Sequence, residues 1–356
     1  LILAFVAIND ISLYFGIRRI CYKLKSRGLA KIIALSPVII SFCFILFSVG
    51  YIFMLRISDQ PDFIIYRKYF LLSALFLLIF LPKCFLLFFI ILETIIRYSA
   101  FILSKLFYSG NNKISIRFMQ LKWFTRIGLV AGLAAFIIVM NGILFGRTDF
   151  EVVHYKIEFK NLPPEFDGFR IAHISDLHLG SFSDPKDVEK GFLLLMNEKP
   201  DIILISGDMV NNQAEELYPM METLKELKAP YGVYSILGNH DVGDYRRWAT
   251  IKEKEADIKT LIATQQAVGI IMLIDENVLL KKGNDSMALI GVNSWENPPF
   301  NRYGNLKKAM KGIENISFKI LITHSPSHWD EEVMGKTDIS LTLSGHTHAM
   351  QMGINC

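Results

Sequence analysis

The chain has 356 residues, a formal net charge of +4 and a hydrophobic fraction of 52%, which is high for a soluble protein. Its four cysteines show neither metal-ligand spacing nor a disulfide framework, so they leave the redox compartment open. Residues 1–146 contain long apolar runs separated by basic loops, whereas residues 151–356 read like an ordinary soluble α/β domain. We therefore expect a helical membrane region followed by a globular domain, within the two or three domains that this length allows.

Four apolar segments in the first region are candidate membrane-spanning helices, because about 20 apolar residues cross the hydrocarbon core. They lie at residues 1–17, 32–55, 70–92 and 127–146. The last segment is rich in small residues, which let helices approach closely in lipid. The first is short and carries Asp10 near its middle, at a cost of about 2.5–3.5 kcal/mol on insertion scales. Asp10 is interpreted as a helix-packing or interfacial residue or, alternatively, as a functional polar contact inside the bundle.

Lysine and arginine in the connecting loops predict the orientation of these helices. The loops after the first and third segments carry six basic residues each, whereas the loop after the second carries three, offset by Asp59 and Asp62. The two basic loops should therefore be cytoplasmic, and they could also bind acidic lipid headgroups. Four spans would then place the second region on the extracytoplasmic face of the membrane, periplasmic or outer.

The two ends of the chain also carry information. The sequence begins with Leu1 and stops eight residues after His348, so we expect both ends to be incomplete and the second domain to be truncated at its C-terminus. No cleavable signal peptide is evident, because the first apolar stretch lacks a basic leader and a small-residue cleavage site.

The second region alternates short apolar runs with polar motifs. The segment Glu151–Lys160 alternates apolar and polar residues and predicts a half-buried strand. Five further runs each end in residue types that bind metals: Phe169–Ile174, Asp201–Ile205, Gly232–Leu237, Phe318–Ile322 and Ile339–Leu343. Helical patterns lie between them at Lys186–Lys199, Glu215–Leu227 and Tyr245–Thr264. This repetition predicts an α/β domain whose active site lies at the strand ends.

The polar motifs after these five runs contain Asp176-x-His178, Asp208, Asn239-His240-Asp241, His324 and His346-x-His348. Five of the eight histidines fall in these motifs, and the other three, His154, His173 and His328, are interpreted as core or surface residues. A spacing of two residues places both side chains on the same side of an extended backbone. The motifs therefore offer nitrogen and oxygen ligands for two divalent ions, without the thiolates that structural zinc sites use.

In this order, the five motifs resemble those of the calcineurin-like metallophosphoesterase superfamily over about residues 165–350. The phrases at 174–180 and 323–328 resemble its membrane-associated bacterial branch, which includes phosphodiesterases and a UDP-2,3-diacylglucosamine pyrophosphate hydrolase. One departure lies after the last motif: this branch usually has two glycines before a glutamine, and here Ala349 and Met350 precede Gln351.

The resemblance implies a β-sandwich of two mixed sheets flanked by helices, and two divalent ions of Mn, Fe or Zn, among which the ligand types do not choose. It assigns the ligands as follows: a first ion held by Asp176, His178 and His348, a second held by Asn239, His324 and His346, and Asp208 bridging both. A water activated between the ions would attack phosphorus. His240 would protonate the leaving oxygen, and Asp241 would orient the His240 ring.

Two further features are candidate substrate contacts. Arg246 and Arg247 could meet a second phosphate, or they could form a solvated helix start. Trp295 opens a loop at residues 295–300 whose aromatic side chains are expected to be exposed, and which could contact an acyl chain or cap the sheet. The second region has no dense basic stripe, so nucleic acid is not an expected partner.

Three functions remain open at this point. The leading prediction is a phosphodiesterase or pyrophosphatase that acts on a membrane-associated, and even lipid-linked, phosphate ester. The second is a UDP-2,3-diacylglucosamine pyrophosphatase-type enzyme, which would need a cytoplasmic UDP-linked substrate. The third is a non-catalytic membrane scaffold that keeps the fold, although scaffolds should have lost ligands and none is lost here. The oligomeric state is not predicted.

Overall fold

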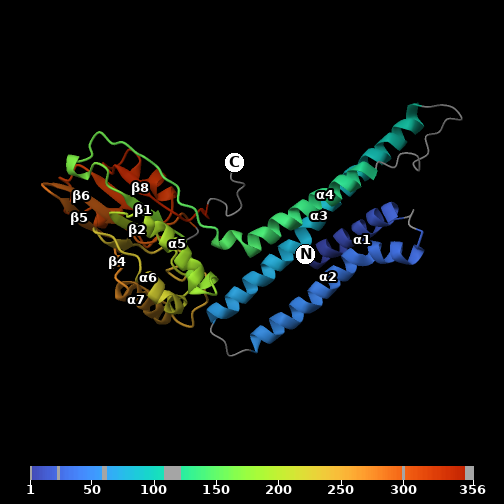
Figure 1. The fold of residues 1–356 in the computed structure, drawn as a ribbon, viewed down its shortest axis with the longest axis horizontal. Coiled ribbons are helices and arrows are strands. Elements are labelled where there is room, and N and C mark those ends of the chain that lie inside the picture. Colours follow the sequence, from blue (N-terminus) through green and yellow to red (C-terminus); the bar gives the residue numbers. More distant parts are fainter. Residues whose placement is uncertain (1, 22–24, 58–61, 108–121, 299–300, 349–356) are drawn as a thin grey trace. The chain divides into compact units, whose positions relative to one another are not determined.

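In the computed structural model the chain forms two compact units, Leu1–Arg147 and Thr148–Cys356 (Figure 1). The structure describes all residues except 1, 22–24, 58–61, 108–121, 299–300 and 349–356. The departure at Ala349 and Met350 therefore lies outside the described residues, as do Pro299 and Phe300 of the aromatic loop and much of the basic stretch before the fourth apolar segment.

Four helices form the first unit: α1 Ile2–Cys21, α2 Arg27–Arg56, α3 Asp62–Phe107 and α4 Lys122–Leu144. Among the described residues, three helical stretches are long and apolar enough to cross a membrane: Arg27–Arg56, Arg67–Leu106 and Trp123–Thr148. Helix α1 is not one of them, so a fourth span stays a prediction. The predicted extracytoplasmic location of the second unit does not depend on whether α1 spans the membrane. If the loop before α2 is cytoplasmic, the three remaining spans also end on the outer face.

Helix α4 packs closely against α3 through two of its glycines. A methyl group at Gly132 would lie 2.9 Å from the carbonyl oxygen of Pro82, and one at Gly128 would lie 2.9 Å from the Cβ of Phe89. Side chains at these positions would therefore push the helices apart. The small residues of the fourth apolar segment thus act as predicted, as surfaces for close helix packing.

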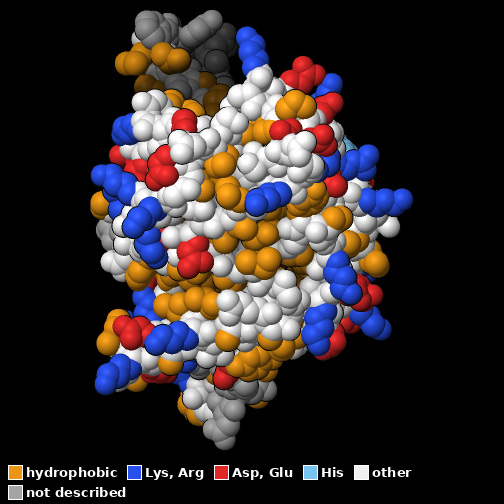
Figure 2. Space-filling view, turned by 90° about the vertical axis from the view of Figure 1, so that its left-hand side faces the viewer, with side chains coloured by type: hydrophobic (Ala, Val, Ile, Leu, Met, Phe, Trp, Pro, Cys, Tyr) orange, Lys and Arg blue, Asp and Glu red, His pale blue; other side chains and the backbone are white. Residues whose placement is uncertain are grey.

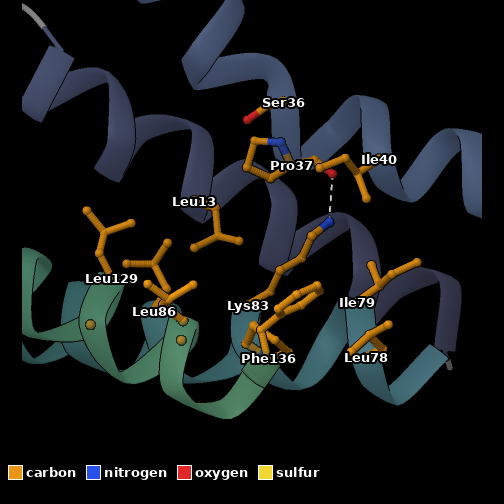
Figure 3. A pocket seen from close by; sticks show the side chains of 14 residues that line it. Leu13, Ser36, Pro37, Ile40, Leu78, Ile79, Lys83, Leu86, Leu129 and Phe136 are labelled. Atoms are coloured by element: carbon orange, nitrogen blue, oxygen red, sulfur yellow. Dashed lines mark hydrogen bonds between the residues drawn. The ribbon is translucent and has the colours of Figure 1, made fainter. Parts of the chain in front are cut away.

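A buried group of polar atoms, which we call the membrane cluster, joins α1, α2 and α3. Its centre is the Lys83 ammonium, whose Nζ lies 3.0 Å from Asp10 Oδ1, 2.6 Å from the carbonyl oxygen of Pro37 and 2.6 Å from Ser41 Oγ. A lysine ammonium has three N–H donors, so each donor has a partner. Figure 3 shows Lys83 pointing toward Pro37 across a mainly apolar groove of about 310 Å³. Asp10 is therefore a packing residue inside the bundle, held by a charge on another helix.

The second unit contains two four-stranded sheets. Sheet A has the order β1 Ile171–Ile174, β2 Ile202–Ile205, β3 Val233–Ser235 and β4 Ile271–Met272, all parallel. Sheet B has the order β5 Glu276–Lys282, β6 Asp285–Gly291, β7 Lys319–Ile322 and β8 Leu341–Leu343, and only β5 runs antiparallel to its neighbour. The five predicted strands with metal-binding ends are thus confirmed as β1, β2, β3, β7 and β8. One of the two sheets is mixed, whereas the described strands of sheet A are all parallel.

The layers of this unit follow from the two faces of each strand. Ile203 and Ile205 of β2 face a core shared with α5 Pro185–Asn197, α6 Met221–Leu224 and α7 Ile251–Ala267, the helices drawn beside sheet A in Figure 1. The alternate residues Ile202 and Leu204 face a second core that they share with sheet B. The outer face of sheet B packs on α8 Leu306–Ala309. The result is the predicted sandwich of two sheets with helices outside.

Short helices of other types complete the second unit: the 3₁₀ helices Pro164–Phe166, Leu179–Ser181 and Ala214–Met220, and the π-helical turn Trp329–Val333. A further 3₁₀ turn, Gly146–Thr148, lies at the boundary between the two units. The predicted helix at Glu215–Leu227 is therefore wrong in type, because its first part is 3₁₀ and only α6 is α-helical. Pro219 lies inside this segment, and proline cannot donate the backbone hydrogen bond of a continuous α-helix.

Two other predicted elements are also corrected. The segment Glu151–Lys160 forms no strand within the described residues, where Val153 and Tyr155 are 62% and 84% exposed. Alternation alone does not make a strand, because the backbone groups need a partner strand. The helix expected at Tyr245–Thr264 begins only at Ile251, where the Thr250 side chain accepts from the Glu253 backbone N–H and caps it.

Candidate metal centre

The candidate site lies where β1, β2, β3, β7 and β8 end. At these points five site residues have left-handed backbone conformations, with positive φ: Asp176, His178, Asp208, His346 and His348. Such angles are uncommon for residues other than glycine, although Asp, Asn and His tolerate them best. The chain turns sharply after β1, β2 and β8 and places candidate metal-binding side chains at these turns. Backbone strain of this kind gathers at functional sites.

A first donor group contains Asp176, His178, Asp208 and His348, whose candidate ligand atoms all lie within 4.8 Å of one another. The Nε2 atoms of His178 and His348 are 3.2 Å apart, and His348 Nε2 is 3.3 Å from Asp176 Oδ1. His178 Nε2 lies 3.6 Å from Asp208 Oδ2. These are the four residues predicted for the first ion.

A second donor group contains Asn239, His324 and His346, together with the same Asp208. His346 Nδ1 lies 3.0 Å from Asn239 Oδ1 and 3.2 Å from His324 Nε2. His324 Nε2 lies 3.2 Å from Asp208 Oδ2. Asp208 is 1% exposed and His324 is fully buried, so this group is largely shielded from solvent.

Backbone carbonyl groups fix the orientation of the site's imidazole rings. His178 Nδ1 lies 3.2 Å from the carbonyl oxygen of Val210, and His324 Nδ1 lies 2.8 Å from that of Ser206. A carbonyl oxygen accepts only, so Nδ1 carries the proton in both rings and Nε2 is left as the metal-facing nitrogen. Metal-ligating histidines use their second nitrogen in this way.

These donor sets fit divalent cations on chemical grounds. The carboxylates of Asp176 and Asp208 converge beside the unprotonated Nε2 of His178, and these electron-rich atoms repel one another. A cation placed among them removes that repulsion, and nitrogen and oxygen ligands suit Mn, Fe or Zn. The seven predicted ligands thus come together in two groups that share Asp208.

His240 lies beside the first donor group, and its ring packs edge-on against that of His178 with centroids 4.7 Å apart. Its Nδ1 lies 2.6 Å from the carbonyl oxygen of Asn211. The predicted role of Asp241 is therefore wrong, because a backbone carbonyl orients the ring. The Asp241 carboxylate instead accepts from the backbone N–H groups of Val210 and Gly238, at 3.1 and 2.9 Å. Asp241 thereby ties the loop after β2 to the loop after β3.

Two supporting residues escaped the sequence analysis. The Tyr245 hydroxyl accepts from Asn239 Nδ2 at 2.9 Å, which leaves Asn239 Oδ1 for a metal, and its ring stacks on His240 at 4.4 Å. Buried Glu216 accepts from three successive backbone N–H groups that begin at Asn211, at 2.6, 2.9 and 3.2 Å. It holds the loop that presents the Asn211 carbonyl to His240. Tyr245 was hidden inside a wrongly predicted helix, and no local pattern points to Glu216.

A third missed residue is Glu296, which forms a cluster of possible metal ligands with His324 and His346, all within 4.8 Å.

The side chain of the neighbouring Trp295 was expected to be exposed, and the structure corrects this expectation. Trp295 is 1% exposed, stacks on His328 at 4.6 Å and donates from Nε1 to Glu332 at 3.1 Å. Trp295 is therefore a core residue of the loop, and a substrate contact would require the loop to open.

The two candidate arginines lie in turns before α7. Arg246 is partly buried, with its guanidinium 4.5 Å from the centroid of the Trp248 ring, and Arg247 is exposed. A contact with a second phosphate stays a prediction for both.

Figure 2 shows one face of the molecule, on which basic and acidic side chains are interspersed. The histidines outside the motifs lie as interpreted, with His154 at the surface and His328 in the core.

Electrostatics separate the site residues further. Burial lowers the pKa of His178 to about 4, so its imidazole is neutral at physiological pH. Burial also lowers the pKa of His324, but the hydrogen bond and the charge of Asp208 outweigh it and raise that pKa to about 9. Burial and the nearby Asp208 charge raise the pKa of Asp241 to about 7. The Asp208 charge thus raises the pKa of both His324 and Asp241.

Comparison with known proteins agrees with this geometry. The profile of the calcineurin-like phosphoesterase family matches residues 169–350. A zebrafish (Danio rerio) "Transmembrane protein with metallophosphoesterase domain" is 26% identical over 222 residues, which are 61% of this chain and 48% of that protein. A Bacillus subtilis protein described as "Uncharacterized metallophosphoesterase YkuE" is 27% identical over 57% of this chain and 66% of its own length. The chain thus spans about half the length of the zebrafish relative.

A Helicobacter pylori relative described as an uncharacterized metallophosphoesterase is 26% identical over 308 residues, 84% of this chain and 74% of its own length. That match is longer than the second unit, so it extends into the helical unit. Among solved structures, a phosphopantetheinyl hydrolase from Mycobacterium tuberculosis covers 51% of this chain and 79% of its own at 14% identity, with a TM-score of 0.29, which is too low to support an argument. The family profile covers more than half of the residues and contains all five motifs, and the chain therefore belongs to the calcineurin-like phosphoesterase family.

Proposed function

We propose that this chain is a membrane-anchored, two-metal hydrolase that cleaves phosphodiester or pyrophosphate bonds in a membrane-associated substrate. One observation carries the proposal: the carboxylate of Asp208 lies against both donor groups, 3.6 Å from His178 Nε2 and 3.2 Å from His324 Nε2. A carboxylate shared in this way suits two neighbouring cations, which clamp the attacking and leaving oxygens of a phosphoryl transfer.

The first donor group would hold one ion and the second group the other. When bound, two such ions activate water as a nucleophile and neutralise charge that develops on the phosphate. The protein contributes a frame, because the ligands sit on turns at the ends of five strands, of which β2, β3 and β7 are fully buried. Within the second group, His324 is fully buried, whereas the His346 side chain is 34% exposed and open to substrate.

His240 is suited to protonate the leaving oxygen. Its ring belongs to neither donor group, and its Nδ1–H donates to the carbonyl oxygen of Asn211. The proton that moves is therefore the one on Nε2, which passes to the oxygen of the departing alcohol or phosphate as the P–O bond breaks. Tyr245 stacks on the ring and limits its rotation.

The membrane unit supports the substrate class. Three stretches of the described chain are long and apolar enough to span a bilayer, and the zebrafish relative is itself described as transmembrane. An anchored site meets esters carried by lipids, or released near the bilayer, more often than esters in bulk solution. The loop charges favour an extracytoplasmic site, and cysteine-accessibility labelling at residues 200–300 tests that orientation.

A substrate panel tests the proposed reaction. The full chain in detergent with Mn²⁺ should hydrolyse bis(p-nitrophenyl) phosphate, and it should be compared on the monoester, UDP-diacylglucosamine and phospholipids, with Asp208→Asn as the inactive control. Turnover of a diester or pyrophosphate that Asp208→Asn abolishes supports the proposal. A wild-type protein that holds two ions yet cleaves none of these compounds would indicate a non-catalytic scaffold.

A further inference from the structure

Glu296 lies at the end of a strand that the sequence patterns did not reveal. Strand β6 runs parallel to β7, which runs parallel to β8. The residues that follow these three strands therefore gather at one edge of sheet B. His324 follows β7, His346 follows β8 and Glu296 follows β6. The same topology that places the two histidines in the second donor group thus delivers a carboxylate to it.

The Glu296 side chain faces that group. It is 4% exposed, and its Oε2 lies 3.8 Å from His346 Nε2, whereas the Nδ1 of that ring is the atom near Asn239 and His324. One candidate ligand atom from each of Glu296, His324 and His346 lies within 4.8 Å of the others. The Ser325 hydroxyl is a hydrogen-bond partner of the Glu296 carboxylate. The buried Oε1 atom of Glu296 has no hydrogen-bond partner.

The loop holds this carboxylate in place. Trp295 is buried against His328, and the Arg302 guanidinium lies 4.1 Å from the centroid of the Trp295 indole. Arg302 Nε also donates to the backbone carbonyl of Glu296 at 2.9 Å. A buried carboxylate oxygen without a donor is unfavourable unless a cation satisfies it. The fold therefore keeps one buried carboxylate oxygen of Glu296, Oε1, without a hydrogen-bond donor beside two histidines of the second donor group.

We propose that Glu296 is a further ligand of the second metal ion, an inference that rests on the two-metal site proposed above. Each ion then has one carboxylate of its own, Asp176 for the first and Glu296 for the second, and the two ions share Asp208. The added oxygen also shifts the second ligand set toward carboxylate and amide oxygens, which favour harder ions such as Mn²⁺.

Metal binding to the full chain in detergent tests this assignment. After chelation, Mn²⁺ is titrated by calorimetry and by electron paramagnetic resonance into the wild type, Glu296→Gln and the control Glu332→Gln. Glu332 contacts the same loop, at Trp295 Nε1 and His328 Nε2, but lies outside both donor groups. The wild type and the control should bind two ions, whereas Glu296→Gln should bind one of the two about 10- to 100-fold more weakly.

Thermal unfolding of the metal-free proteins separates ligation from a structural role. A metal ligand is unsatisfied without metal, so metal-free Glu296→Gln should unfold at a temperature no lower than the wild type. A lower unfolding temperature, or unchanged affinity for both ions, overturns the assignment of Glu296. If the wild type itself binds fewer than two ions, the proposed two-metal function fails instead, and the two failures are distinguishable.

Discussion

The two units of this protein each bury a polar cluster, and the clusters differ in how they are satisfied. In the membrane cluster, the three donors of Lys83 meet Asp10, Ser41 and a backbone carbonyl, so one positive charge balances one negative charge. At the strand ends, carboxylates and imidazole nitrogens face one another at 3.2–3.6 Å. The first cluster is complete within the chain, whereas the second, in the function proposed above, would be completed by divalent cations. Charge balance therefore distinguishes a polar group that stabilises helix packing from one that is prepared for chemistry.

The largest expected effect is on the general acid, His240, which lies beside the strand-end cluster but belongs to neither donor group. Replacing His240 with alanine should leave metal binding intact and lower turnover of an alkyl phosphodiester by about 10²–10⁴-fold, since a positioned general acid contributes that much. Steady-state kinetics with Mn²⁺ measure the loss, and a diester with a p-nitrophenolate leaving group should lose much less. Full activity of the variant on the alkyl diester would refute the role of His240.

Breaking the membrane cluster should affect stability and leave the chemistry unchanged. Lys83→Met leaves Asp10 buried without its partner, which costs about 3–5 kcal/mol for a buried pair. The double variant Asp10→Asn with Lys83→Met removes both charges and should recover most of that loss. Thermal unfolding in detergent measures both variants. Equal destabilisation by the single and double variants would show that the ion pair is not what holds these helices.

Protons should compete with metal at the strand-end cluster. The pKa of His324 is about 9 without metal, so His324 is protonated at pH 7 and must lose that proton to bind an ion. The pKa of His178 is about 4, so its ring is already neutral at pH 7 and its Nε2 needs no deprotonation. Affinity for the second ion should therefore fall about tenfold for each unit that pH drops from 9 to 6. Calorimetric titration in two buffers of different ionisation enthalpy detects the released proton, and pH-independent affinity would contradict this account.

The smallest expected effect lies outside both clusters, at the exposed Arg247. If its guanidinium meets a second phosphate, Arg247→Ala should raise KM for a pyrophosphate substrate by at most about fivefold, as expected of an exposed charge pair. KM for bis(p-nitrophenyl) phosphate should not change. A pyrophosphate KM that also stays unchanged would show that Arg247 is only a solvated turn residue.

The sequence predicted the parts of the site that repeat. Each of the five strands β1, β2, β3, β7 and β8 is followed by Asp, Asn or His, the residue types of the candidate metal site, and the strands were predicted from that pattern. Parallel pairing then brings ligands as distant as Asp176 and His348 to one edge. The spacing did not show that these turns adopt left-handed backbone angles.

Features that depend on packing across the chain were missed. The hairpin of β5 and β6 did not stand out as strands, so the carboxylate of Glu296 at its end was not recognised. Neither could a pattern show that Asp241 turns toward two backbone N–H groups and away from its neighbour His240. Asp10 was noticed as an unfavourable charge in a helix, but its partner Lys83 lies 73 residues away.

The most direct test of the central claim is a count of the divalent ions bound per chain, by elemental analysis of the full protein after equilibration with Mn²⁺. The account predicts two ions in the wild type, two in the double variant Asp10→Asn with Lys83→Met, and fewer than two in Asp208→Asn. Two ions in Asp208→Asn, or a count that falls when only the membrane cluster is changed, would contradict the claim that the strand-end cluster holds the metals.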